Sequence, residues 1–275
     1  MTDYRIREHP ILAIPNHEEL FFFWKGEQLS GVVGETIASA LFAHGIRIFG
    51  SHPKDGSPQG IFCANGQCSQ CLVLADGNPV KSCMELIQPG MHIEPANGHP
   101  ELPRVEQLPD MAPVQELKTE VLVIGGGPAG LSAAIELGKR GVPVILVDDK
   151  HRLGGKLVLQ THRFFGSTEA VFAGTRGIDI ATRLESEIRE LSSVDIWLNS
   201  TALAVYSDQK VGILKEGNTY LLIQPKAILV ACGAREKFLA FKGNTLPGVY
   251  GAGAFQTLVN RDLIKPAEKL FIVGG

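Results

Sequence analysis

The chain has 275 residues, of which 44% are hydrophobic and 20% charged, and its net charge is −3. Such a composition is typical of a soluble globular protein with one large domain or two smaller ones. It gives no sign of nucleic-acid binding, and no apolar run approaches the roughly 18 residues of a membrane span. The opening residues, MTDYRIREHP, resemble neither a secretory signal nor a transit peptide, so we expect a cytoplasmic protein.

The first predicted elements are two strands joined around KGEQ and one helix, all within ELFFFWKGEQLSGVVGETIASALFAHGI. We expect the helix to begin at Glu35 or Thr36 and to end before Gly45. A cysteine-containing loop follows. A hairpin, a helix and then a cysteine loop is the order of a β-grasp ferredoxin, which we assign to residues 1–95.

Four of the five cysteines are clustered: Cys63, Cys68, Cys71 and Cys83 give the spacing C-x4-C-x2-C-x11-C. The first two intervals match the plant-type ligand run of a [2Fe-2S] cluster, which needs four thiolates. Gly66 lets the backbone turn tightly while nearby N–H groups point at the negatively charged cluster. We therefore predict that these four cysteines bind a [2Fe-2S] cluster.

The fourth cysteine is placed by a predicted hairpin. Residues 72–75 read as a short strand, Asp76 and Gly77 as a turn, and the return segment carries Cys83 back toward the loop.

Zinc is the main alternative, but structural zinc sites usually pair two short cysteine knuckles, whereas here three ligands are clustered and one is apart. Unliganded thiols are a third possibility. The remaining cysteine, Cys232, lies in an apolar run and is expected to be a buried small hydrophobe.

Five prolines between Pro95 and Pro113 interrupt any apolar periodicity, so residues 96–118 are predicted to be a linker.

A dinucleotide-binding motif follows in TEVLVIGGGPAGLSAAIELGKRGVPVILVDDK, with an apolar strand before the glycines and a helix and a second strand after them. Gly125 makes the turn, Gly127 lets the backbone approach a pyrophosphate, and Gly130 allows the helix to pack closely on the strand. Asp148, or its neighbour Asp149, would accept hydrogen bonds from the ribose hydroxyls.

Two later segments favour FAD over NAD as the dinucleotide. Gly154 and Gly155 suit a chain passing a flavin's pyrophosphate and ribityl chain, with an ordinary surface turn as the alternative. Farther on, a strand ends in the small residues Ala231, Gly233 and Ala234, which allow the backbone to approach a cofactor closely.

Five segments follow one another along the chain: GIFCANGQCSQC with its fourth cysteine, VLVIGGGPAG, LGGK, VACGA and LPGVYGAGAFQ. This order resembles that of the large subunits of heteromeric flavin-dependent amine and imino-acid dehydrogenases and oxidases. Sarcosine oxidase, dye-linked proline dehydrogenase, opine oxidase and hydrogen cyanide synthase components belong to this group. The similarity covers nearly the whole chain.

This resemblance implies an α/β protein in which a β-grasp [2Fe-2S] domain precedes a Rossmann-like FAD-binding domain of the disulfide-reductase type. The FAD contacts that it implies are Gly125, Gly127, Pro128, Ala129, Gly130, Asp148, Gly154, Gly155, Lys156, Ala202, Ala231, Gly233 and Ala234. Among these, Ala202 falls where such flavoproteins contact the adenine through backbone atoms.

Two departures from the family pattern stand out. The usual Ala-Thr-Gly stretch is here Ala-Cys-Gly, and the chain stops at EKLFIVGG, which looks like the opening of a second dinucleotide domain. We therefore predict that residues 119–268 are the first segment of a C-terminally incomplete FAD domain. Residues 269–275 would then begin a domain, cut off here, that binds NAD(P) in the family.

The function implied by the resemblance is transfer of electrons from an amine or imino-acid substrate through FAD and the cluster to an acceptor, with other subunits of a heteromeric enzyme as partners. An NAD(P)H-dependent reductase feeding the cluster is one alternative, and a non-catalytic [2Fe-2S] carrier is another. We find no pairing of base and nucleophile in the sequence, so no catalytic residue is predicted.

Overall fold

The computed structural model describes residues 3–14, 18–101 and 113–274. The chain divides into two compact units, residues 1–107 with 235–275 and residues 108–234, which are considered one at a time. No helix in the described ranges is long and apolar enough to cross a membrane.

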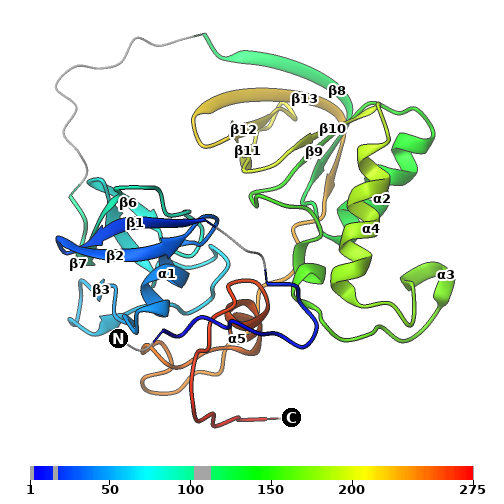
Figure 1. Cartoon of the computed structure of the whole chain (residues 1–275). Helices are drawn as coiled ribbons and strands as arrows, with labels where there is room; N and C mark the ends of the chain where they lie inside the picture. Colours follow the sequence, from blue (N-terminus) through cyan, green and yellow to red (C-terminus); the bar gives the residue numbers. More distant parts are fainter. Residues whose placement is uncertain (1–2, 15–17, 102–112, 275) are drawn as a thin grey trace. The chain divides into compact units, whose positions relative to one another are not determined.

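The first unit is built on a mixed seven-stranded sheet with the order β2-β1-β7-β3-β4, in which β5 pairs with β7 and β6 (Figure 1). The strands are β1 (Glu19–Trp24), β2 (Glu27–Val32), β3 (Gly50–Ser51), β4 (Pro58–Gln59), β5 (Leu72–Ala75), β6 (Asn78–Lys81) and β7 (His92–Asn97). The first hairpin is antiparallel, and β1 runs parallel to β7.

The sheet and helix α1 (Ile37–Ala43) enclose one apolar core. Side chains of β1 alternate, so that Leu20, Phe22 and Trp24 face inward. Thr36 caps α1 by accepting a hydrogen bond from the backbone N–H of Ser39, and every residue of the helix is buried. The expected hairpin and helix are therefore present.

A segment distant in sequence completes this core. Helix α5 (Ala252–Asn260) contributes Ala254 and Leu258, and Ile264 follows from the next loop. The compact units thus differ from the predicted domain limits, because this apolar burial draws residues 235–275 to the first unit.

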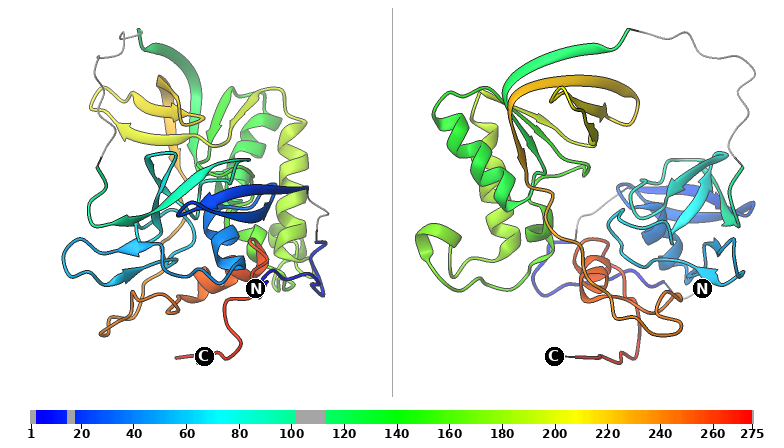
Figure 2. Two further views of the ribbon diagram at one scale, coloured as in Figure 1. Left: turned by 60° about the vertical axis from the view of Figure 1, so that its left-hand side comes forward. Right: turned by 180° about the vertical axis from the view of Figure 1, so that it is seen from behind.

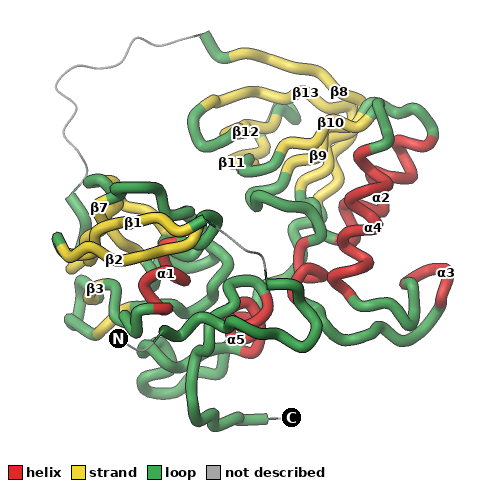
Figure 3. The backbone as a smooth tube through the Cα atoms, viewed as in Figure 1, coloured by secondary structure: helices red, strands yellow, loops and turns green. Residues whose placement is uncertain are grey.

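The second unit contains a six-stranded sheet with the order β10-β9-β8-β13-β12-β11 (Figure 3). Its strands are β8 (Gln115–Ile124), β9 (Val144–Val147), β10 (Val194–Trp197), β11 (Thr201–Val205), β12 (Val211–Lys215) and β13 (Thr219–Val230). The first four in this order are parallel, and β11, β12 and β13 pair antiparallel. The helical elements are α2 (Pro128–Lys139), η1 (Gly155–Leu159), α3 (Thr168–Val171) and α4 (Gly177–Arg189).

Helices α2 and α4 lie together on one face of the parallel strands, as Figure 2 shows. Leu131 of α2 and Leu184 of α4 pack there against Val123 and Leu146 of the sheet. This strand, glycine turn, helix and strand order is the predicted Rossmann-like arrangement. Of the predicted linker, residues 102–112 lie outside the described residues, and residues 115–118 open β8.

Candidate functional site

The cysteine loop lies between β4 and β5, and the hairpin β5–β6 returns the chain to it as predicted. Ser82, directly after β6, donates hydrogen bonds from its backbone N–H and its hydroxyl to the carbonyl of Cys71, at 3.1 and 2.6 Å. These bonds place Cys83 beside the loop. Cys63, Cys71 and Cys83 are buried and Cys68 is half-buried.

The four thiols hydrogen-bond to one another, and these contacts shift their pKa values in opposite directions. The pKa of Cys63 lies far below its ordinary value because the Cys68 and Cys83 thiols hydrogen-bond to it. Backbone N–H groups of Asn65 and Gln67 add to this effect, whereas burial opposes it. These contacts therefore favour the thiolate form of Cys63.

The pKa of Cys71 is lowered in the same way, to about 7, because the Cys83 thiol hydrogen-bonds to it. The contact with Cys63 in return raises the pKa of both Cys68 and Cys83. The four sulfur atoms thus form one connected set, as a cluster bound by four cysteines requires.

Zinc and a [2Fe-2S] cluster place different demands on four cysteines. Structural zinc needs four ligands around one ion, whereas the four cysteines of a [2Fe-2S] cluster are divided between two irons. Three of the four cysteines lie within nine positions and the fourth lies apart, a spacing that matches the ligand run of the cluster.

The loop turns at Gly66, where φ is +80°. This left-handed backbone suits glycine, and a Cβ there would also lie 3.0 Å from Met84. Lys81 donates a hydrogen bond to the carbonyl of Gly66 at 2.7 Å, which secures the turn to β6.

In the second unit, the glycine turn follows the end of β8. Gly125 has φ of +111°, and a Cβ at this position would collide with the carbonyl group of Ala231. A Cβ on Gly130 would collide in turn with the carbonyl oxygen of Gly125, which explains the close packing of α2 on the strand. No side chain caps the first turn of α2, which begins at Pro128 and continues with Ala129. Pro128 has no N–H and the N–H of Leu131 donates to Gly127, so the first turn offers the N–H groups of Ala129 and Gly130 to an anion such as a pyrophosphate.

The second glycine pair packs directly on this turn. The N–H of Gly154 donates to the carbonyl of Gly126 at 2.8 Å, and a Cβ on Gly155 would lie only 2.8 Å from the Cα of Gly127. Lys156 follows within η1. Two segments that are far apart in sequence thus form one backbone surface that larger side chains would disrupt.

Asp148 and Asp149 have different environments at the end of β9. The two carboxylate oxygens of Asp148 accept hydrogen bonds from the N–H groups of Gly126 and Lys150, at 2.6 and 2.8 Å. Burial raises the pKa of Asp148, and these two bonds oppose the increase. Asp149 is exposed and pairs with the Lys150 ammonium at 2.9 Å. The hydrogen bond from Gly126 fixes the Asp148 carboxylate against the glycine turn, so the geometry favours Asp148 over the exposed Asp149 for contact with a ribose.

The small residues at the end of β13 lie beside this site. The N–H of Ala231 donates to the carbonyl of Ile124 at 2.7 Å, and Gly233 has φ of +72° with open space around its Cβ position. Ala234 follows directly. The expectation that Cys232 is buried is wrong: β13 ends two residues earlier, and the thiol is exposed.

Ala202 belongs to β11, where it pairs with Ile213 just before a β-bulge. The segment leading to it is tied to the candidate site, because the N–H of Ser200 donates to the carbonyl of Asp148 at 2.9 Å. The ends of β8, β9 and β13, which are neighbouring parallel strands, therefore meet at one carboxyl edge, where dinucleotides bind in such sheets.

Sequence reasoning missed one charged group near the cysteines. Arg261 lies 178 residues beyond Cys83 and places its guanidinium Nη2 atom 3.5 Å from the Cys83 carbonyl oxygen. No local motif signals this contact, because it depends on how α5 packs within the first unit.

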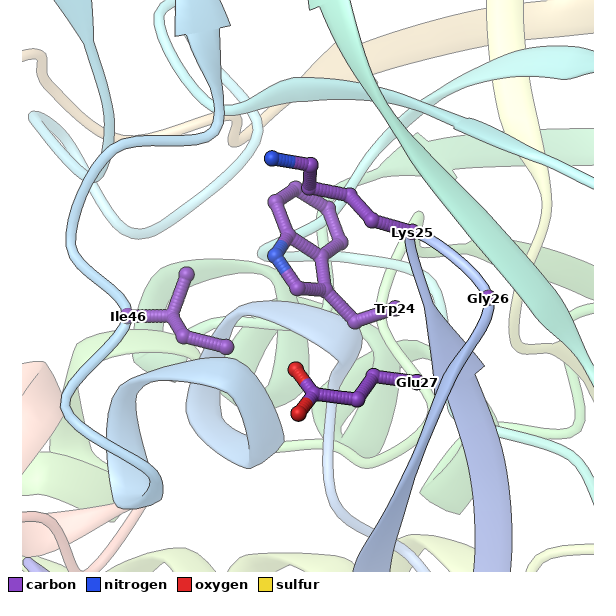
Figure 4. A pocket seen from close by; sticks show the side chains of 5 residues that line it. All are labelled: Trp24, Lys25, Gly26, Glu27 and Ile46. Atoms are coloured by element: carbon purple, nitrogen blue, oxygen red, sulfur yellow. The ribbon is translucent and has the colours of Figure 1, made fainter.

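A hollow of about 500 Å³ on the first unit is lined by Trp24, Lys25, Gly26, Glu27 and Ile46 (Figure 4). None of these residues belongs to either candidate cofactor site. Trp24 packs within the core, and Ile46 packs against its edge. The hollow therefore does not mark the position of a predicted cofactor.

Comparisons with known proteins agree with the two sites. Residues 17–98 match the 2Fe-2S iron-sulfur cluster binding domain, and residues 119–275 match the pyridine nucleotide-disulphide oxidoreductase family. The molecule is thus an iron–sulfur flavoprotein with a flavin-dependent oxidoreductase domain. Because the second match covers more than half of its residues, the chain belongs to the pyridine nucleotide-disulphide oxidoreductase family.

Two curated relatives and one solved structure extend this result. Sarcosine oxidase subunit alpha from Rhizobium meliloti is 26% identical, covering 98% of this chain and 33% of that protein. Hydrogen cyanide synthase subunit HcnB from Pseudomonas aeruginosa is 30% identical, covering 56% of this chain and 33% of that protein. The crystal structure of L-proline dehydrogenase from P. horikoshii has a TM-score of 0.77 at 22% identity, covering 94% of this chain and 49% of that one.

These findings confirm the predicted fold class, the family resemblance and the two cofactors, [2Fe-2S] and FAD. The chain spans about a third of the length of both curated relatives.

Proposed function

We propose that this chain is the iron–sulfur flavoprotein subunit of a heteromeric enzyme that oxidises an amine or imino acid. The observation that carries the proposal is the presence, in one chain, of a connected set of four thiols and a glycine-lined carboxyl edge of a Rossmann-like sheet. When bound, FAD accepts two electrons together, and the cluster carries one electron at a time.

The cysteine loop would hold the cluster through Cys63, Cys68, Cys71 and Cys83. Burial of three of these residues excludes water from the sulfur atoms, and the N–H groups of Asn65 and Gln67 stabilise negative charge on Cys63. These features support a site for an anionic cluster.

The carboxyl edge of the second sheet would hold FAD. The start of α2 would face the pyrophosphate, and Asp148 would accept from the ribose. The full proposed set is Gly125, Gly127, Pro128, Ala129, Gly130, Asp148, Gly154, Gly155, Lys156, Ala202, Ala231, Gly233 and Ala234, with Asp149 as the alternative to Asp148.

The substrate class and the partner subunits come from the relatives. Sarcosine oxidase subunit alpha is named as one subunit of an enzyme that acts on sarcosine, an N-methylated amine, and it covers nearly all of this chain. We infer a substrate of the same chemical class and at least one further subunit. The cytoplasmic location stays a prediction from the sequence.

The test uses a tagged chain purified anaerobically from its own cells, so that partner subunits are retained. Sarcosine is added in one cuvette, and NADH or NADPH in another. Absorbance reports flavin reduction, and electron paramagnetic resonance reports the reduced cluster. We expect sarcosine to produce both signals. The variant Cys83→Ser, which removes one proposed ligand, should retain flavin bleaching and lose the cluster signal.

Each alternative has its own outcome. Reduction by NADH or NADPH, with no response to sarcosine or to other secondary amines, would replace the proposal by a nicotinamide-dependent reductase. Iron without flavin in the purified complex would indicate a one-electron carrier instead.

A further inference from the structure

A buried ion pair lies next to the cysteine loop. Arg261 contacts the Asp262 carboxylate twice, through Nε at 2.6 Å and Nη2 at 3.0 Å. The side chains are only 19% and 5% exposed, so both charges have been removed from water. The Nη2 atom also lies 3.5 Å from the carbonyl oxygen of Cys83. A charge is therefore held beside one proposed ligand.

The fold fixes this pair firmly. The N–H groups of Arg261 and Asp262 both donate to the carbonyl of Thr257 in the last turn of α5, at 2.9 and 3.1 Å. Leu258 before the pair and Ile264 after it are fully buried in the core. The guanidinium position is thus set by the packing of α5 and not by a mobile side chain.

The arginine stays charged in this position. An arginine guanidinium does not lose its proton in proteins, and the Asp262 carboxylate pairs with it at 2.6 and 3.0 Å. A buried ion pair is weak evidence for stability, because desolvation costs roughly as much as the pairing returns. The location of the pair therefore calls for a different explanation.

We propose that Arg261 raises the reduction potential of the [2Fe-2S] cluster, and that Asp262 limits this increase. The inference rests on the proposed ligand role of the four cysteines. Reduction adds one electron, and so one negative charge, to the cluster and its thiolates. A nearby cation favours that added charge, and net charge is one of the factors that sets cluster potentials.

The two partners should consequently have opposite effects. Arg261→Gln removes the cation and leaves the carboxylate, so the reduced cluster becomes less favourable. Asp262→Asn removes the carboxylate that partly neutralises the guanidinium. The full positive charge then acts on the cluster, and its reduction becomes more favourable. A structural role alone would move both variants in the same direction, toward loss of cluster.

The experiment is a redox titration of the full chain with dithionite, followed by electron paramagnetic resonance, with iron content measured for each variant. We expect the ratio of reduced to oxidised cluster at a fixed potential to fall about tenfold in Arg261→Gln, which corresponds to ~59 mV for a one-electron couple. In Asp262→Asn the ratio should rise. The control Lys265→Gln removes a 56% exposed cation four residues away and should leave the potential unchanged.

Several results would overturn the inference. Unchanged potentials, or shifts of the same sign in both variants with iron retained, would contradict it. Loss of iron from both variants would show that the pair only stabilises the loop. Absence of any [2Fe-2S] signal in the unmodified chain would instead refute the ligand assignment itself. That result would count against the proposed function, whereas the results above count only against the role of Arg261.

Discussion

The two candidate cofactor sites of this chain are spread over very different lengths of sequence. The four cysteines lie between Cys63 and Cys83, and one hairpin brings them together. The proposed FAD residues extend from Gly125 to Ala234, and several of them lie where three parallel strands end side by side. A local site depends on the conformation of one loop, whereas a distributed site depends on the register of a whole sheet.

The nature of the contacts differs as well. The cysteine site uses side chains, whose sulfur atoms alter one another's pKa. The glycine-lined edge uses mainly backbone, and its essential property is that side chains are missing. Removing a ligand should therefore abolish the first site, whereas adding a methyl group should damage the second.

The largest expected effect is that of Cys83→Ser. A serine hydroxyl is not a thiolate at neutral pH, so one of four ligands is lost. We expect iron and acid-labile sulfide to fall to near zero per chain, while bound FAD is unchanged, because the FAD residues belong to the other compact unit. Chemical iron and sulfide assays and the flavin spectrum measure both.

The matched control is Cys232→Ser, which alters the exposed fifth cysteine. This variant should retain both cofactors. Full iron content in Cys83→Ser would contradict the ligand assignment, and simultaneous loss of FAD would contradict the independence of the two sites.

A smaller effect is expected from Gly155→Ala. The added Cβ would lie 2.8 Å from the Cα of Gly127, and φ at this position is +53°. Overpacking and left-handed strain together cost about 3 kcal/mol, or roughly a hundredfold in FAD affinity if the backbone moves to relieve them. Titration of the chain with FAD, followed by quenching of flavin fluorescence, gives the affinity.

Gly141→Ala controls for strain alone, because φ there is +71° but nothing lies near the Cβ position. This variant should lose about 1 kcal/mol of stability and none of its FAD affinity. Equal losses of affinity in the two variants would show that close approach at Gly155 is not what matters.

The local parts of this molecule could be predicted from sequence, and the non-local parts could not. The cysteine spacing, the Asp-Gly turn and the glycine motif each fall within about 30 residues, so their geometry follows from local chemistry. The position of α5 in the first unit depends on burial of Leu258 and Ile264 among residues about 200 positions earlier, which no local pattern encodes.

The same limit explains the two errors at the sites. Cys232 follows an apolar strand and so looks buried, but β13 ends at Val230, and the residues beyond it lie outside the ladder. Arg261 looks like an ordinary charged residue at the end of a helix, and only the tertiary packing of that helix brings it to Cys83.

The smallest expected effect comes from Asp148→Asn, which tests a side chain at the backbone-lined site. Both carboxylate oxygens accept backbone N–H groups, so an amide would place one N–H₂ group against a donor. Loss of one charge-assisted bond costs about 1.5 kcal/mol, or roughly tenfold in FAD affinity. Asp149→Asn is the control, since its carboxylate is exposed and pairs only with Lys150 among the contacts described.

Burial raises the pKa of Asp148, so this carboxylate takes up a proton at higher pH than an ordinary aspartate. The affinity of the unmodified chain should therefore fall as the pH is lowered through this raised pKa, and that of Asp148→Asn should not. A larger loss of affinity in Asp149→Asn than in Asp148→Asn would transfer the ribose contact to Asp149, and the second site would then depend on an exposed side chain as well as on its backbone.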